Sequence, residues 1–285
     1  MTRKSLFHFA LVGVLWGIPY LLMKIAVEDF PPAAVVAGRT LIGASILIPI
    51  ANYRKKFGGA VLGFRYVAFY ALMEMIGPWI LITTAEQKIN TGLAGLLVST
   101  VPIFATIITS LRGDHSVWQF KRIFGIIVGF IGLILVVGIE SLSGNSDPLS
   151  IGMVVLASMG YAYAVIMVTS NLPLIDGIAI NGLAMAITTV FWAPVAIAQW
   201  PSSISMNSAL SLIALGVFST AIAFILFFKV MAEIGPARSS LVTYLNTAIA
   251  VVLGVIILRE PLTVGIILGL PLVLVGSYLA SRKTA

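Results

Sequence analysis

Residues 5–27 read SLFHFALVGVLWGIPYLLMKIAV, an almost uninterrupted apolar run. An α-helix needs about 20 such residues to cross the hydrocarbon core of a bilayer. Comparable runs follow along the whole chain, at about 33–52, 66–85, 92–111, 121–139, 149–170, 177–199, 209–231, 237–258 and 263–281. The pattern predicts an all-α integral membrane protein with ten transmembrane helices.

The composition leaves little room for anything else. Hydrophobic residues make up 60% of the 285 positions, charged residues only 9%, and the mean hydropathy is +1.10. An ordinary soluble domain has roughly 25% charged residues. Ten helices of ~20 residues use about 200 positions, so the connections are short and no separate soluble domain fits. Cysteine is absent, which excludes disulfides and thiolate metal sites, and we expect neither a metal nor a cofactor.

The chain has a net charge of +7, and the positions of its basic residues indicate its topology in the membrane. With the spans above, most cations fall on one side: Arg3, Lys4, Arg54, Lys55, Lys56, Arg65, Arg112, Lys121, Arg122, Lys229, Arg238, Arg282 and Lys283. The other side receives little beyond Lys88 and Arg259, with Lys24 near a helix end. The positive-inside rule therefore predicts that both termini are cytoplasmic. We expect a location in the plasma membrane, the inner membrane of a bacterium, and no nucleic-acid partner.

A spacing of small and polar residues occurs twice, about 144 residues apart: Ser116, Gly125 and Gly132, then Glu260, Gly269 and Gly276. Five predicted helices separate the two copies. Because five is odd, the second copy enters the bilayer from the opposite face. The spacing predicts two inverted five-helix repeats, over residues 1–140 and 149–285. Under nearly the same offset, Trp16 corresponds to Tyr161, and Pro102 to Asn246 or Thr247.

Four motifs carry a family resemblance: Glu260-Pro261-Leu262-Thr263, Trp16-Gly17, Pro32 ahead of Arg39, and Gly235-Pro236-Ala237. With them the chain resembles the EamA branch of the drug/metabolite transporter superfamily, and within that branch the YddG-type aromatic amino acid exporters. The resemblance implies a transporter built of two EamA repeats. The chain departs from the family pattern in having Ser116 where the second half has Glu260, so the two halves can differ in role.

Glu74 is the only acidic residue well inside a predicted span. A carboxylate facing lipid is costly, so Glu74 should face the bundle interior or a wet cavity. There it can bind a substrate ammonium or a coupling proton, or donate a structural hydrogen bond when protonated. Gly77 and Pro78 follow about one turn later, and a proline removes one helical hydrogen bond and bends its helix. We expect a kink beside Glu74, with Met73 adding an adaptable apolar surface.

Aromatic residues suggest the kind of substrate. Trp16 and Tyr20 share a helical face, and Trp16 lies near the membrane centre, about 17 Å along its helix. The pseudo-symmetric Tyr161 is similarly central. The rings either wall a cavity in which an apolar side chain stacks, or pack in the core.

Further polar residues lie near mid-depth in the fourth and ninth predicted helices. Ser99 and Tyr244 can bind substrate or cross-link helices, as can Asn246. For Arg39 a structural ion pair or carbonyl contact is favoured over a substrate carboxylate, and Lys24 is interpreted as an interface anchor. The candidate substrate-binding residues are Trp16, Tyr20, Met73, Glu74, Gly77, Pro78, Ser99, Pro102, Tyr161, Tyr244 and Asn246.

These features favour a secondary transporter that exports amino acids, aromatic or large apolar, and related small metabolites by alternating access around a midplane cavity. Export of amphipathic or cationic drugs is the alternative, since a carboxylate beside aromatic rings also suits a cation. An enzyme is disfavoured because the two histidines show no catalytic or metal-binding spacing. A channel is disfavoured because no ring of charges or filter loop is present. Nothing in the sequence requires an oligomer.

Overall fold

The computed structural model describes residues 3–113, 119–142, 147–234, 239 and 242–281. Every element formed by these residues is helical, which confirms the predicted all-α class. The first half contains α1 (Arg3–Ala26), α2 (Pro32–Tyr53), α3 (Phe57–Leu62), α4 (Phe64–Ala71), η1 (Leu72–Ile76), α5 (Gly77–Ala85), α6 (Thr91–Val98), α7 (Val101–Leu111) and α8 (Phe120–Leu142). The second contains α9 (Pro148–Asn171), α10 (Gly177–Ala198), α11 (Met206–Ala214), η3 (Leu215–Ile222), α12 (Ala223–Ile234), α14 (Val242–Ile256) and α15 (Val264–Ser281).

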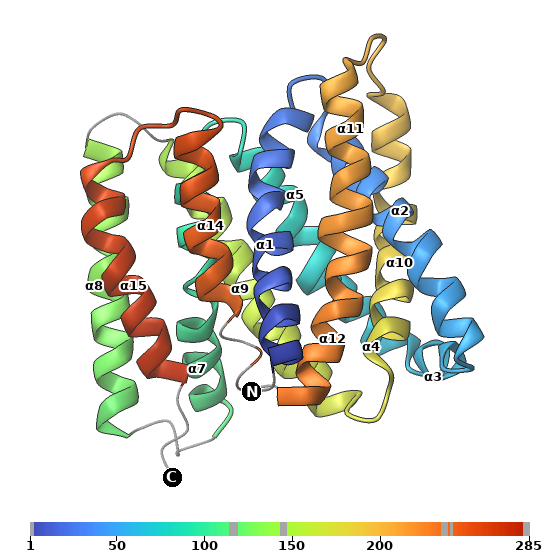
Figure 1. Cartoon of the computed structure of the whole chain (residues 1–285). Coiled ribbons are helices and arrows are strands. Elements are labelled where there is room, and N and C mark those ends of the chain that lie inside the picture. Colours follow the sequence, from blue (N-terminus) through green and yellow to red (C-terminus); the bar gives the residue numbers. More distant parts are fainter. Residues whose placement is uncertain (1–2, 114–118, 143–146, 235–238, 240–241, 282–285) are drawn as a thin grey trace.

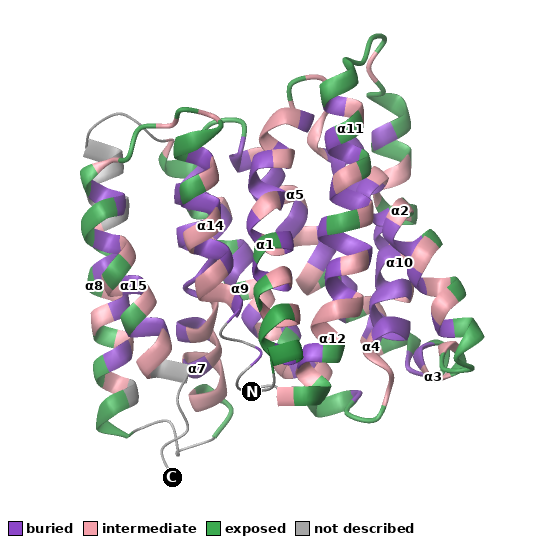
Figure 2. Ribbon diagram, viewed as in Figure 1, coloured by how far each residue is buried: buried purple, intermediate pink, exposed green. Residues whose placement is uncertain are grey.

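Helix length and hydropathy fit a multi-pass membrane protein. Within the described residues, seven continuous helical stretches are long and apolar enough to cross a membrane: Arg3–Ala26, Pro32–Tyr53, Phe64–Ala85, Thr91–Leu111, Pro148–Asn171, Gly177–Ala198 and Met206–Ile234. Three shorter apolar stretches accompany them: Ile123–Leu135, Val242–Ile256 and Val264–Leu279. Large apolar side chains are exposed on the outer faces of the bundle, among them Val190, Phe191 and Ile197 of α10, as expected of a lipid-facing surface (Figure 2). The count of ten crossings remains a prediction.

The first helix of each half packs into the other half. Helix α1 contacts α14 and the α11–η3–α12 unit, whereas α9 contacts the α6–α7 unit and the α4–η1–α5 unit. The pairs α2 with α10, α6 with α14 and α8 with α15 also form contacts across the halves. These contacts are symmetric: replacing each helix of one half by its counterpart in the other half gives the same set of contacts. This symmetry supports the predicted repeat, whose boundaries and inversion remain predictions. Ser116, used to infer the repeat, and Gly235-Pro236-Ala237, used for the family resemblance, lie outside the described residues.

We call the helical units that correspond to the predicted spans crossing units. Three of them are not regular α-helices. η1 and η3 are π-helical segments at corresponding places in the two halves, and the fourth unit turns at Ser99 and Thr100 between α6 and α7. Proline explains two of these interruptions, because Pro78 follows η1 and Pro102 follows the turn, and neither has a backbone N–H to donate. η3 contains no proline, and the sequence reasoning did not predict it.

The start of α1 and the end of α15 lie at the same end of the bundle (Figure 1). The connection between α9 and α10 lies at that end too, and we call it the terminal end of the bundle. Which side of the membrane it faces remains a prediction.

Glycine allows α8 and α15 to approach at backbone distance. A Cβ added to Gly276 would collide with the backbone of Gly129 and lie 2.7 Å from the Gly125 carbonyl oxygen. Backbone atoms cannot move aside as a flexible side chain can. The α8–α15 contact therefore requires a glycine at position 276.

We predict that Gly276→Ala lowers the thermal unfolding midpoint of the purified protein in detergent, because overpacking costs about 1–3 kcal/mol. Gly152→Ala in α9 is the matched control, since a Cβ there meets nothing within 4 Å. An unchanged midpoint for Gly276→Ala would contradict the backbone contact.

Candidate functional site

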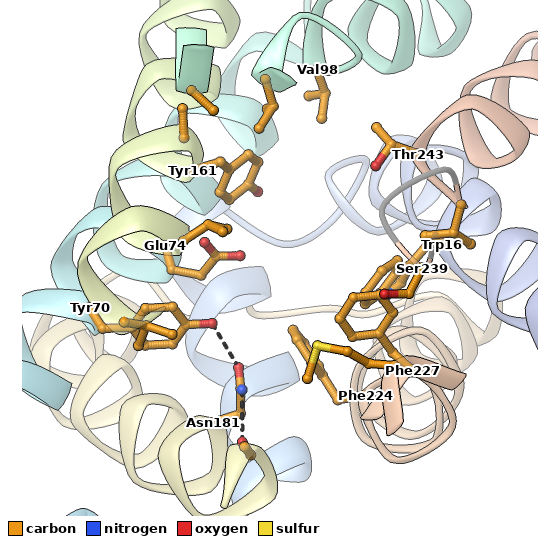
Figure 3. Close-up of a pocket in the computed structure, with 18 of the residues that line it drawn as sticks. Trp16, Tyr70, Glu74, Val98, Tyr161, Asn181, Phe224, Phe227, Ser239 and Thr243 are labelled. Atoms are coloured by element: carbon orange, nitrogen blue, oxygen red, sulfur yellow. Dashed lines mark hydrogen bonds between the residues drawn. The ribbon is translucent and has the colours of Figure 1, made fainter. Parts of the chain in front are cut away.

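A cavity of about 710 Å³ lies between the two halves, and every crossing unit except α8 and α15 contributes to its described lining. Figure 3 shows Glu74 and Tyr161 on one wall, with Trp16, Phe224 and Phe227 on the other. This volume is within the range of roughly 300–1,000 Å³ typical of small-molecule sites. The cavity has the size and position of a substrate site.

The π-helical turn η1 determines which side chains accompany Glu74 into the cavity. In a regular α-helix, Pro78 would share the face of Glu74. A π-helical turn has hydrogen bonds from residue i to residue i+5, so it adds about one residue and rotates the positions that follow it. Trp79, five residues after Glu74, therefore lines the cavity, while Pro78 does not. The indole Nε1 of Trp192 donates to the Ile76 carbonyl at 3.1 Å and so satisfies a backbone oxygen at the end of η1.

No described residue pairs with the Glu74 carboxylate. Its Oε2 atom is buried and accepts no hydrogen bond, and no lysine or arginine nitrogen of the described residues lies within 4.0 Å of its carboxylate. The carboxylate points into the cavity (Figure 3). A buried carboxyl group without a partner is costly and is available to a cationic or hydrogen-donating ligand.

The wall around Glu74 carries three further polar groups. Tyr161 lines the cavity on the same wall as Glu74 (Figure 3). Tyr70, one turn before Glu74, donates to Asn181 Oδ1 at 3.1 Å, and both residues are buried (Figure 3). This bond joins the third crossing unit to α10 and orients the Tyr70 ring along the cavity.

The opposite wall is aromatic. The ring of Trp16 lies 5.6 Å from that of Phe224 and 4.6 Å from that of Phe227, measured between centroids. Phe228 extends the group, 6.3 Å from Phe224. These edge, tilted and stacked ring pairs form an apolar surface that faces Glu74 across the cavity.

Arg39 lines the cavity from α2 and is only 6% exposed. Its Nε and Nη2 atoms donate to Thr220 Oγ1 of η3 at 3.3 and 3.1 Å, and Nη1 lies 3.7 Å from Met23 Sδ. The guanidinium carbon is 3.8 Å from the ring centroid of Trp79, a cation–π contact. Among the described residues Arg39 makes neither the expected ion pair nor a hydrogen bond to a carbonyl, and its partners are a hydroxyl, a sulfur and an aromatic ring.

The structure brings six of the eleven predicted site residues together around the cavity: Trp16, Tyr20, Glu74, Pro102, Tyr161 and Asn246. The other five do not line it: Met73, Gly77, Pro78, Ser99 and Tyr244. They lie outside the lining because the rotational phase of each helix depends on local irregularities and on packing.

The five excluded residues pack elsewhere. Met73 and Pro78 lie against α9, where a Cβ on Gly160 would meet Met73 O and Pro78 Cγ. Gly77 begins α5. Ser99 is fully buried, donates to Leu96 O at 2.6 Å, and accepts from Ser277 of α15 through its carbonyl. The Tyr244 ring faces Tyr278 of α15 at 6.3 Å.

Several lining residues were missed: Tyr70, Trp79, Asn181, Ser219, Phe224 and Phe227. One signal for Tyr70 was present, because it precedes Glu74 by four residues and so shares its helical face. Asn181 was a second signal, since it is an amide inside an apolar helix. The side on which the phenylalanines of α12 point could not be found from their apolar surroundings.

The cavity reaches the terminal end of the bundle. Its lining includes Leu172, Pro173 and Ile175 from the α9–α10 connection, together with Thr109 and Met231. The connections at the other end, residues 27–31, 86–90, 199–205 and 257–263, contribute no described lining residue. We call that other end the closed end.

Polar bonds join the two halves at the closed end. Glu260 accepts hydrogen bonds from the backbone N–H groups of Thr91 and Gly92 at 2.9 and 3.4 Å and so caps the N-terminus of α6. Asp29 accepts a 2.9 Å bond from the backbone N–H of Ser205. Bonds from Ser205 lower the pKa of Asp29. The stabilisation from this bond is therefore complete above the ordinary pKa of Asp29 and disappears as the pH falls through the lowered value.

Lys24 reinforces the closed end within the first half. Its ammonium donates to the carbonyl oxygens of Glu86 and Ile89 at 2.6 and 2.9 Å. The predicted interface anchor thus holds α1 against the connection between the third and fourth crossing units. Glu86, which follows α5, is fully buried beside this bond.

Comparison with known proteins identifies the family. The profile of the EamA-like transporter family matches residues 3–138 and, a second time, residues 148–282. The chain belongs to the EamA-like transporter family. It is therefore a multi-pass membrane transporter, and membership of a transporter family argues against an enzyme.

Two relatives that are similar over nearly the full length are named as uncharacterized transporters. The uncharacterized transporter YoaV of Bacillus subtilis is 26% identical, over 94% of this chain and 93% of its own length. The uncharacterized inner membrane transporter YedA of Escherichia coli K12 is 25% identical, over 95% of this chain and 90% of its own length. A solved crystal structure with 15% identity covers 98% of this chain and 97% of its own, with a TM-score of 0.69, and shows that the fold is shared.

We predict that Thr220→Val destabilises the protein by about 1–3 kcal/mol, because it leaves two N–H groups of a buried guanidinium without their acceptor. Thr188→Val is the matched control, since Thr188 is equally buried but donates only to the Ala184 carbonyl of its own helix. Thermal unfolding in detergent measures both, and equal midpoints would show that the Arg39–Thr220 contact does not stabilise the fold.

Proposed function

We propose that this EamA transporter exports amino acids, aromatic or large apolar, and related small metabolites across the plasma membrane. One observation carries the proposal: the unpartnered carboxylate of Glu74 faces the aromatic wall of Trp16, Phe224 and Phe227 across a 710 Å³ cavity. An ammonium bound at Glu74 places an apolar side chain against those rings. The preference for aromatic side chains also draws on the resemblance to YddG-type exporters.

We further propose that transport proceeds by alternating access. The cavity lies where the halves meet, reaches the terminal end, and is separated from the other side by the bonds of the closed end. Rocking of one half against the other would break the Glu260 and Asp29 bonds and open that end. With both termini in the cytoplasm, this state faces inward and is ready to receive a substrate for export.

The same cavity supports a second candidate function, export of amphipathic cations. A quaternary or aromatic amine would pair with Glu74 and lie against Trp16 by cation–π attraction. Saturable counterflow of labelled phenylalanine in proteoliposomes, inhibited by other large apolar amino acids, would support amino acid export. Counterflow of tetraphenylphosphonium but not of phenylalanine would support the alternative.

We predict that Glu74→Gln weakens phenylalanine counterflow by about 10–100-fold, because a charge-assisted hydrogen bond contributes roughly 1.5–3 kcal/mol. Glu28→Gln removes one carboxylate from an exposed position outside the cavity and should leave counterflow unchanged. Unaltered counterflow in Glu74→Gln at every pH from 5 to 8 would remove Glu74 from the mechanism.

Because one end of the cavity is closed, we predict that a thiol in the cavity can be reached from only one side of the membrane. Because the chain has no cysteine, Ala105→Cys introduces a single thiol in the cavity lining, and Ala184→Cys a fully buried thiol outside it. A membrane-impermeant maleimide should modify Ala105→Cys from the side of the chain termini and should not modify Ala184→Cys. Adding Glu260→Ala, which removes the cap on α6, should increase labelling from the other side. Labelling of Ala105→Cys only from the side opposite the termini would refute the proposed state.

A further inference from the structure

Arg39 and Glu74 line one cavity, carry opposite charges and do not pair. The guanidinium comes from α2 and the carboxylate from η1, and their nitrogen and oxygen atoms are more than 4.0 Å apart. Oppositely charged groups serving only to stabilise the fold would gain by contact, since an unpaired buried charge costs several kcal/mol. Their separation leaves each charge available to a ligand.

Arg39 is oriented but not saturated. An arginine has five N–H donors. Two hydrogen bonds to Thr220 and one contact with Met23 use three, which leaves two without an acceptor among the described residues. Trp79 covers one face of the guanidinium and holds its plane. Arg39 is a lining residue of the cavity, and a carboxylate bound there is a natural acceptor for its remaining donors.

Trp79 relates the two charges in space. Its ring centroid lies 3.8 Å from the Arg39 guanidinium carbon, and it follows Glu74 by five residues on the cavity-lining side of the same helical unit. A ligand that pairs with both groups needs an ammonium and a carboxylate in one small molecule. The cavity also contains the unpartnered hydroxyl of Ser219, 1% exposed, in the π-helical segment that carries Thr220.

We propose that the site selects zwitterions, with Arg39 binding the carboxylate and Glu74 the ammonium of an α-amino acid. This inference builds on the proposed amino acid transport and adds the residue that distinguishes amino acids from simple amines. The zwitterion neutralises both buried charges at once. A simple amine leaves Arg39 unpaired, and a simple carboxylate leaves Glu74 unpaired. Each mismatch is penalised because the unmatched group stays buried without a partner.

Three labelled compounds with the same ring test the proposal on the full chain in proteoliposomes: phenylalanine, phenethylamine without the carboxylate, and 3-phenylpropanoate without the ammonium. In the unmodified protein, phenylalanine should bind at least tenfold more tightly than either. Arg39→Gln should weaken the binding of phenylalanine and of phenylpropanoate about 10–100-fold. It should leave the binding of phenethylamine unchanged or make it tighter. Arg39→Lys should restore part of the carboxylate binding.

Arg65→Gln is the matched control, because it removes an exposed arginine that stacks on Tyr66, outside the cavity. It should leave all three affinities unchanged. If Arg39→Gln lost affinity equally for all three compounds, Arg39 would have a purely structural role and the inference would be overturned. The proposed amino acid transport would not be affected by that result. If Arg39→Gln fails to fold, equal binding of phenylalanine and its methyl ester to the unmodified protein would overturn it. If none of the three compounds binds, the proposed substrate class itself fails.

Discussion

Within a bilayer, every backbone N–H and C=O group must find its partner inside the protein, because the hydrocarbon offers none. Irregular backbone is therefore tolerated only where protein or a wet cavity covers it. In this transporter the irregular segments are the ones that build the cavity. η1 brings Glu74 and Trp79 onto one face, and η3 supplies Ser219 to the cavity and Thr220 to Arg39.

Several charged groups at the closed end are bonded to backbone, whereas Glu74 in the cavity is not. At the closed end, the ammonium of Lys24 and the carboxylates of Glu260 and Asp29 all have hydrogen-bond partners on neighbouring backbone. In the cavity, Glu74 and Ser219 have unpartnered oxygens. Unsatisfied buried polar groups persist in proteins where they serve a ligand, since they otherwise cost stability. The closed end also contains unpartnered buried oxygens, those of the Glu86 carboxyl group and the Thr91 hydroxyl, so it is the open cavity around Glu74 and Ser219 that distinguishes them.

Interdigitation of the halves explains why the site lies where it does. Helices α1 and α9 each pack into the opposite half, so the cavity is walled by both halves, with Trp16 and Tyr161 at corresponding positions across it. Helices α8 and α15 form a glycine-mediated pair that does not contribute to the lining. The α8–α15 pair therefore joins the two halves outside the cavity.

The sequence alone determined the helical membrane class, the approximate limits of the spans, and that Glu74 points to the interior of the bundle. Hydropathy and the cost of a lipid-facing charge are local properties, so they can be inferred from the sequence. It also found Trp16 and Tyr161, through the helical period and the repeat. Only the tertiary structure decided that Trp79 and not Pro78 accompanies Glu74, since a π-helical turn changes the rotational phase of everything after it. The same holds for the partners of Arg39, because Thr220 is 181 residues away and reaches it only through the packing of η3 on α2.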